Sequence, residues 1–160
     1  MATYTPLNVG TSGQFVELRI STDSSLVSNT GTWTSTATTN AIIVPALQDI
    51  TVTNSNGTFR WVTLDSASRA VVATPATNSL NLNIVLDDTS FFTGAGTTTG
   101  IFALSNTKQK VYFKFTFGGG STRYLTGSGY LANLAPKVNP DQPVWVSPLV
   151  IEVDGNYTLV

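Results

Sequence analysis

The sequence contains no histidine and no cysteine. Without these residues the chain cannot build a Ser-His-Asp or Cys-His catalytic group, a thiolate zinc site or a disulfide. Glutamates are also scarce: only Glu17 and Glu152 are present, on different predicted strands, while the adjacent Asp87 and Asp88 would point to opposite faces of a strand. A glycosidase needs two carboxylates that flank one bond. We therefore expect no enzymatic activity, no cofactor and no metal ion.

Charge is the next shortage. Charged residues make up 11% of the chain, against about 25% in typical globular proteins, and the net charge is −1. A surface with few charges does little to keep copies of the chain apart, which suits a protein that buries much of its exterior against neighbours. Because no lysine-rich run is present, we do not expect binding of nucleic acid through phosphate neutralisation, although DNA could pass without adhering.

Long apolar runs are missing as well. No stretch approaches the roughly 18 apolar residues of a membrane helix, so we expect no membrane anchor. The N-terminal residues MATYTPLNVG lack the basic and apolar segments of a secretory signal. A length of 160 residues fits one domain spanning residues 1–160. The chain is predicted to be soluble and to be made in a cytoplasm.

What the sequence does contain is β-strand patterning. Apolar residues alternate with polar ones over Leu80–Leu86 and Val111–Phe117, and more weakly over Phe15–Ile20. Between the first two runs, apolar residues within Thr97–Thr107 favour about two turns of helix. These patterns predict a mainly antiparallel β fold, a sandwich or barrel of about seven strands with one short helix.

A hairpin is predicted in the first half of the chain. Ala41–Thr53 is expected to form a strand that bends at Pro45, and Phe59–Leu64 the strand that returns. Between them, Asn56-Gly57 is typical of a type I′ turn.

A long polar stretch, residues 21–40, precedes this hairpin. It is rich in Ser, Thr and Asn, and Trp33 is its only aromatic residue. Loops beyond about 12–15 residues are uncommon in compact domains unless they are functional or disordered. Trp33 is therefore either an anchor on a partner or a plug folded onto its own core, and the sequence favours neither.

The last part of the chain, Arg123–Val160, carries the clearest sign of assembly. Asp154-Gly155 predicts a turn into a final strand ending at Val160. Pro143 and Pro148 cannot donate to a ladder, so they favour an edge or bulged strand over Val144–Val153. An apolar edge invites pairing with another chain. The residues predicted to pair between subunits are Val144, Trp145, Val146, Leu149, Val150, Ile151 and Val153.

Two glycine-rich stretches can be interpreted structurally. The segment from Gly94 to Gly100 has neither the spacing nor the lysine of a phosphate-binding loop. Gly127-Ser128-Gly129 lacks the pattern and the base of a nucleophile elbow, and favours a bulge or a close backbone approach. One binding alternative stays open, a carbohydrate-binding β-sandwich whose stacking platform would use the aromatic residues Trp33, Trp61, Trp145, Tyr124 and Tyr130.

The order of elements in the C-terminal half resembles that of long-tailed bacteriophage tail tube proteins (major tail proteins). A short helix at Gly100–Asn106 is followed by the strand Val111–Phe117 and by the ending GSGYLANLAPKVNPDQPVWVSPLVIEVDGNYTLV. This ending comprises a Gly-Tyr-Leu strand, a connection containing Asp141, an apolar strand, a short turn and a terminal strand. The resemblance covers most of the chain as a pattern of elements.

The resemblance implies a structural virion protein. Its subunits would form hexameric rings, and the rings would stack into a tube that conducts DNA to the host. The partners implied are other copies of the chain, together with sheath, terminator, baseplate and tape-measure proteins, and the location implied is the phage tail, after production in the host cytoplasm. Alternative virion roles are decoration, collar, terminator or baseplate protein.

The resemblance also suggests roles for particular residues. The loop between residues 21 and 40 would order against an adjacent ring, through Ser28, Thr30, Trp33 and Thr36. The edge Val144–Val153 would pair with a neighbouring subunit. For the lumen of the tube we propose polar residues of the best strands, namely Asn81, Asn83 and Asp87.

Overall fold

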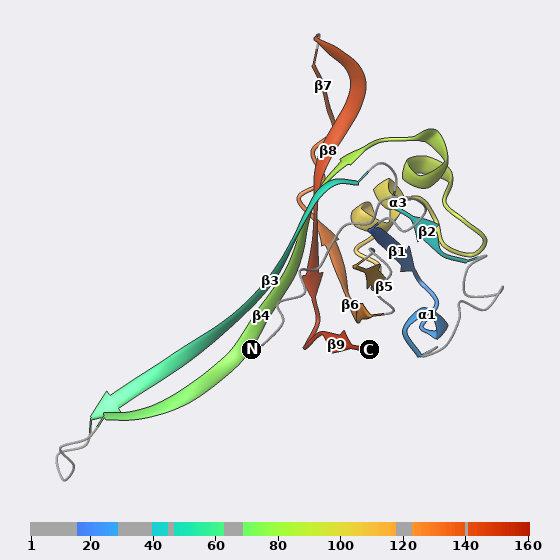
Figure 1. Cartoon of the computed structure of the whole chain (residues 1–160). Helices are drawn as coiled ribbons and strands as arrows, with labels where there is room; N and C mark the ends of the chain where they lie inside the picture. Colours follow the sequence, from blue (N-terminus) through green and yellow to red (C-terminus); the bar gives the residue numbers. More distant parts are fainter. Residues whose placement is uncertain (1–15, 29–39, 45–46, 63–68, 118–122, 140) are drawn as a thin grey trace, which may run out of the picture.

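The computed structural model describes residues 16–28, 40–44, 47–62, 69–117, 123–139 and 141–160 (Figure 1). Most of these residues are in strands, and all pairings between strands are antiparallel. The prediction of a mainly antiparallel β fold is therefore confirmed. In chain order the elements are β1 (Glu17–Ser21), α1 (Ser25–Ser28), β2 (Ile42–Ile43), β3 (Leu47–Val62), β4 (Arg69–Val85), the π-helix η1 (Thr89–Thr93), α3 (Ile101–Asn106), β5 (Val111–Thr116), β6 (Tyr124–Ala132), β7 (Lys137–Asn139), β8 (Gln142–Val153) and β9 (Thr158–Leu159).

The nine strands of the described residues belong to one hydrogen-bonded sheet. Its order is β2-β1-β5-β6-β8-β4-β3, with β7 paired to β8 and β9 paired to β6. The ends of this path, β2 and β3, are not paired with each other within the described residues. The sheet is thus one continuous layer, with α3 and η1 packed on the face that holds the core.

The core comes from alternate residues of the strands, as the sequence predicts. Leu80, Leu82 and Ile84 of β4 are buried, and so are Phe113 of β5 and Ile151 of β8. The helix predicted within Thr97–Thr107 is present as α3 and adds two further buried residues, Ile101 and Leu104. Each large side chain that is fully buried contributes about 1.5–3 kcal/mol through the hydrophobic effect, so this face fixes the register of the sheet.

The predicted hairpin with a turn at Asn56-Gly57 is wrong. β3 continues through both residues as one strand of 16 residues, and it pairs with β4 along its whole length. A bulge interrupts the pairing between Asn56 and Thr58, opposite Pro75, which has no N–H to donate. A Cβ on Gly57 would lie 2.1 Å from the Thr74 hydroxyl, so the glycine lets the two strands approach here without displacing that side chain. The glycine thus marks a close approach between strands, not a turn.

Of the two alternatives predicted over Val144–Val153, the edge strand is wrong from Val146 onward, whereas a register shift against β7 between Gln142 and Trp145 agrees with a bulged strand. β8 lies inside the sheet, with β4 along one side from Val146 to Val153 and β6 along the other from Val150 to Val153. The β6 ladder ends at Val150 and the β7 ladder begins at Val146. Pro148 falls in the gap between these two ladders, so its missing N–H breaks no pairing there. This is why an interior strand tolerates a proline.

The final strand and the glycine motif of β6 agree with the sequence. β9 forms before Val160, after a turn in which Gly155 has a φ of +97°, although its partner is β6 and not the preceding strand. A Cβ on Gly129 would lie 2.1 Å from the carbonyl oxygen of Glu152. This distance confirms the expected close backbone approach.

The polar stretch 21–40 is partly described. It begins with the last residue of β1 and contains α1, a short helix that the sequence did not predict. The backbone N–H of Ser25 donates to the Asp23 carboxylate (2.9 Å), and this bond lowers the pKa of Asp23. Residues 29–39 lie outside the described part of the chain.

No helix within the described residues has both the length and the apolar character needed to cross a membrane.

Candidate functional site

The feature that the sequence did not predict is a two-stranded arm. β8 covers the inner part of β4, from Asn78 to Val85. Beyond that point, Ser55–Val62 of β3 and Arg69–Thr77 of β4 pair only with each other, and in Figure 1 they extend far from the rest of the sheet. We call these two segments the arm. An isolated pair of strands is marginally stable in water unless a third strand or another layer covers it.

The arm carries large apolar side chains that water contacts on both faces. Phe59, Trp61 and Val72 share one face, and the two aromatic rings stack with centroids 5.8 Å apart. Val62 and Val71 lie on the opposite face, beside Arg60 and Arg69. The exposed fractions of these five apolar residues range from 41% to 62%: Phe59, Trp61, Val62, Val71 and Val72. Such a contiguous exposed apolar surface is typical of an interaction site.

The base of the arm is held firmly by the C-terminal turn. The Tyr157 hydroxyl shares its one proton between the carbonyl oxygens of Thr53 (2.9 Å) and Ser79 (2.8 Å), one on each strand. Its ring packs edge-on against Phe113 in the core, and burial raises the pKa of Tyr157. The side-chain amide of the buried Asn78 donates to the carbonyl oxygen of Gly155 (2.7 Å). The direction of the arm is therefore fixed where it leaves the sheet.

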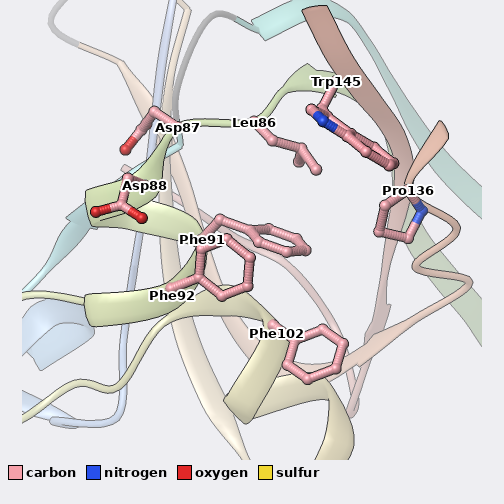
Figure 2. Close-up of a pocket in the computed structure, with 8 residues that line it drawn as sticks. All are labelled: Leu86, Asp87, Asp88, Phe91, Phe92, Phe102, Pro136 and Trp145. Carbon is pink, nitrogen blue, oxygen red and sulfur yellow. The ribbon is translucent and has the colours of Figure 1, made fainter. Parts of the chain in front are cut away.

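A second candidate surface is an aromatic pocket of about 380 Å³ at the end of β4. Figure 2 shows Leu86, Trp145 and Pro136 on one side of the hollow and the phenylalanine rings on the other, with the two aspartates at its edge. The residues that line it are Leu86, Asp87, Asp88, Phe91, Phe92, Phe102, Pro136 and Trp145. The ring of Phe91 is buried and contacts the more exposed rings of Phe92 and Phe102, at centroid distances of 4.8 and 5.8 Å.

Local sequence explains how the pocket forms. Asp87 accepts a hydrogen bond from the Ser90 N–H (2.7 Å) and so fixes the start of η1. Gly94 ends η1 with a φ of +85°, a conformation that few other residues adopt. A Cβ on Gly100 would lie 2.5 Å from the carbonyl oxygen of Phe91, so α3 can approach η1 closely only with glycine there. The Leu86 N–H donates to the Trp145 carbonyl (2.9 Å), which holds together two residues of the wall that faces the phenylalanines.

The residues that were predicted to pair between subunits fall into two sets in the structure, one buried or already paired and one exposed. Leu149, Val150 and Ile151 are buried in the chain's own core, and the backbone of Val146 and Val153 pairs on both sides within the chain. Their assignment to pairing with a neighbour is therefore corrected, because that ladder is already occupied. Val144 and Trp145 remain exposed.

The predicted lumen residues do not form one group. Asn81 and Asn83 share the face of β4 opposite the core, where Asn83 donates to Asp49 (2.8 Å) and Asn81 to Ser79 (3.2 Å). Asp87 lies beyond the end of β4, at the pocket. Of the residues predicted to stack rings, Ser28 ends α1, whereas Thr30, Trp33 and Thr36 lie outside the described residues.

The aromatic residues considered as a sugar platform are likewise dispersed. Trp61 lies on the arm and Trp145 at the pocket, while Tyr124 is buried under Lys114, whose Nζ lies 3.9 Å from the ring centroid. Burial lowers the pKa of Lys114, and the positive charge of Arg19 on the neighbouring strand lowers it further. Within the described residues, no group of three or more carboxylates could hold a metal ion.

The sequence contains a pattern that indicates the arm, but the prediction of a turn at Asn56-Gly57 led away from it. Strand-forming residues lie on both sides of the segment 63–68: Phe59 and Trp61 before it, and Val71 and Val72 after it. Arg60 and Arg69 place a charge within or beside each of these apolar runs. Two strands that are apolar on one face and mixed on the other, without a third strand to continue them, indicate an exposed hairpin.

A search of solved structures finds a similar fold. A chain from the tail of an empty GTA (gene transfer agent) particle, determined by helical refinement with C6 symmetry, superposes with a TM-score of 0.54 at 12% sequence identity. The match covers 89% of this chain and 95% of that chain. At this identity the likeness is one of fold. A scan against protein-family models finds no match, and a search of curated proteins finds none either.

Proposed function

We propose that this chain is a structural protein of a phage-like tail, and that its copies assemble into six-fold rings that stack into a tube. The observation that carries the proposal is the arm. Its apolar side chains lie on both faces, no third strand of the described residues pairs with it, and hydrogen bonds hold its base. A surface of this kind gains its cover from another chain, and in a homo-oligomer that chain is a second copy.

The fold likeness supports the same class of protein. The similar chain belongs to the tail of a particle with C6 symmetry, and the match extends over most of both chains. The low charge of this chain is consistent with dense self-association, since few like charges would oppose it. The shortage of basic residues also fits a tube whose lumen lets DNA pass without retaining it.

Electron microscopy of the purified protein tests the proposal. We expect six-fold rings and tubes from the wild-type chain. The control is a shortened variant in which an Asn-Gly turn joins Asn54 to Asn78, two residues that are cross-strand partners at the base of the arm. This variant retains the core of the sheet, so it should fold as a monomer and form no rings.

The outcomes separate the candidate roles. A wild-type chain that stays monomeric at high protein concentration contradicts the proposal. Single rings that never stack would favour a terminator or baseplate role instead. Assembly at three-fold or five-fold sites of a particle would favour a decoration or collar protein.

A further inference from the structure

We infer that the aromatic pocket is the acceptor for the arm of a second copy of the chain. This inference rests on the proposed self-assembly and names its two contacting surfaces: the Phe59–Trp61 face of the arm, and the hollow between Phe102 and Trp145. Within the described residues no other segment covers either surface, and each exposes large aromatic rings to water.

The two surfaces match in apolar character. The pocket exposes Phe92, Phe102 and Trp145, while the arm presents the stacked rings of Phe59 and Trp61. Aromatic rings bury about 150–250 Å² each and prefer tilted or offset contacts with one another, of the kind already present among the phenylalanines of the pocket. Rings of this type, seated in a water-excluding pocket, contribute most of the binding energy at protein interfaces.

The two surfaces also match in charge. The described residues of the arm contain two arginines, Arg60 and Arg69, and no carboxylate. Both arginines lie on the face opposite Phe59 and Trp61, so they give the arm a net positive charge but do not enter the pocket with the rings. The residues lining the pocket include two carboxylates, Asp87 and Asp88, and no cation. The Asp88 side chain is exposed and makes no capping hydrogen bond to η1. The opposite net charges of the arm and of the pocket rim favour the approach of the two surfaces.

The arm cannot reach the pocket of its own chain. In Figure 1 the arm points away from α3 and from the β7–β8 end of the sheet, where the pocket lies. Tyr157 and Asn78 hold its base in that direction. The contact must therefore join two copies through different surfaces, and a heterologous contact of this type produces closed rings or open stacks.

Cross-linking tests the contact, because the chain has no cysteine of its own. The two cysteines are placed beside the contacting rings, so that the rings themselves stay in place: Ala70→Cys, across from Trp61 on the same face of the arm, and Thr89→Cys, an exposed residue next to Asp88 at the pocket rim. The two variants are purified separately, mixed, assembled and treated with a short thiol-to-thiol cross-linker, and we expect a covalent dimer from this mixture. The matched control replaces Thr89→Cys with Leu159→Cys, because Leu159 is also exposed but lies on β9, at the other end of the sheet. This control mixture should give at least about tenfold less dimer.

A second experiment does not require two cysteines to lie within reach of a cross-linker. The exposed Asp88→Arg substitution should raise the protein concentration needed for assembly by about tenfold, and Phe102→Ser should do the same. Tubes that form normally with both variants, or cross-linking no stronger than with Leu159→Cys, would overturn the assignment of the pocket while leaving self-assembly intact. A wild-type chain that forms no oligomer would overturn both this inference and the proposed function.

Discussion

The two halves of the β3–β4 pair have different environments although the same two strands form both. In the inner half, Leu80, Leu82 and Ile84 are buried, and β8 continues the sheet. In the arm, Val71 and Val72 are exposed, and no third strand in the described part of the chain continues the sheet. The chain therefore carries apolar residues beyond the limit of its own core. The difference indicates that the inner half stabilises the fold and that the arm serves a contact with another molecule.

Truncating one apolar side chain in each half should give the largest contrast. Ile84→Ala removes a fully buried side chain and should cost about 2–5 kcal/mol of unfolding free energy, because the cavity cannot fully collapse. Val72→Ala removes a side chain that is 49% exposed and should change it by no more than about 0.5 kcal/mol. Denaturant unfolding of the monomer measures both values. Equal losses would contradict the division into two halves.

Two glycines provide a matched pair with a smaller effect. A Cβ would lie 2.1 Å from the nearest atom at both Gly129 and Gly57. At Gly129 that atom is the backbone carbonyl oxygen of Glu152, which cannot move without separating β6 from β8, so Gly129→Ala should cost about 1–3 kcal/mol. At Gly57 it is the hydroxyl of Thr74, which can rotate away. Gly57→Ala should therefore cost less than about 1 kcal/mol in the same unfolding measurement, and the reverse order would be a contradiction.

The junction between the halves should be sensitive to Tyr157→Phe. The substitution removes the one hydroxyl proton that the carbonyl oxygens of Thr53 and Ser79 share, at a cost of about 0.5–1.5 kcal/mol. It should also let the arm vary in direction, so assembly should weaken by more than the loss of monomer stability explains. Sedimentation and unfolding of the same samples compare the two effects. A loss of monomer stability without any change in assembly would show that the anchor does not orient the arm.

The smallest expected effect concerns Lys114, a charged residue that is buried in the sheet outside the arm. Burial lowers the pKa of Lys114 in the folded state below the usual lysine value of 10.5. Between these two pKa values the unfolded chain binds more protons than the folded chain, so stability rises with pH. As the pH rises from the folded-state pKa of Lys114 towards 10.5, the wild type should thus gain stability relative to Lys114→Met. If the unfolding free energies of the two proteins changed in parallel with pH, burial of Lys114 would not be the cause of the pH dependence.

Local patterns were sufficient to predict the parts of the fold that local forces determine. The alternation in Leu80–Leu86 and Val111–Phe117 gave the core faces of β4 and β5, and the spacing within Thr97–Thr107 gave α3. These predictions succeeded because one buried face imposes the period of the element on its sequence.

Pairing between distant strands could not be predicted in the same way. Pro148 suggested an edge, but only the ends of the β6 and β7 ladders show that it lies in a gap. Asn56-Gly57 suggested a turn, but the glycine lies within a strand, where it faces Thr74 of the neighbouring strand at close distance. The aromatic pocket joins residues from η1, α3, β8 and the segment before β7, so no single stretch of sequence contains it.

Hydrogen exchange of the arm amides tests the central claim most directly, which is that another copy covers the arm. The measurement compares Ser55–Val62 and Arg69–Thr77 in the monomer and in the assembled protein, with β4 amides from Asn78 to Val85 as the internal reference. We predict that exchange in the arm slows by more than about tenfold on assembly, while the already protected reference changes little. An arm that exchanges at the same rate in both states would contradict the account.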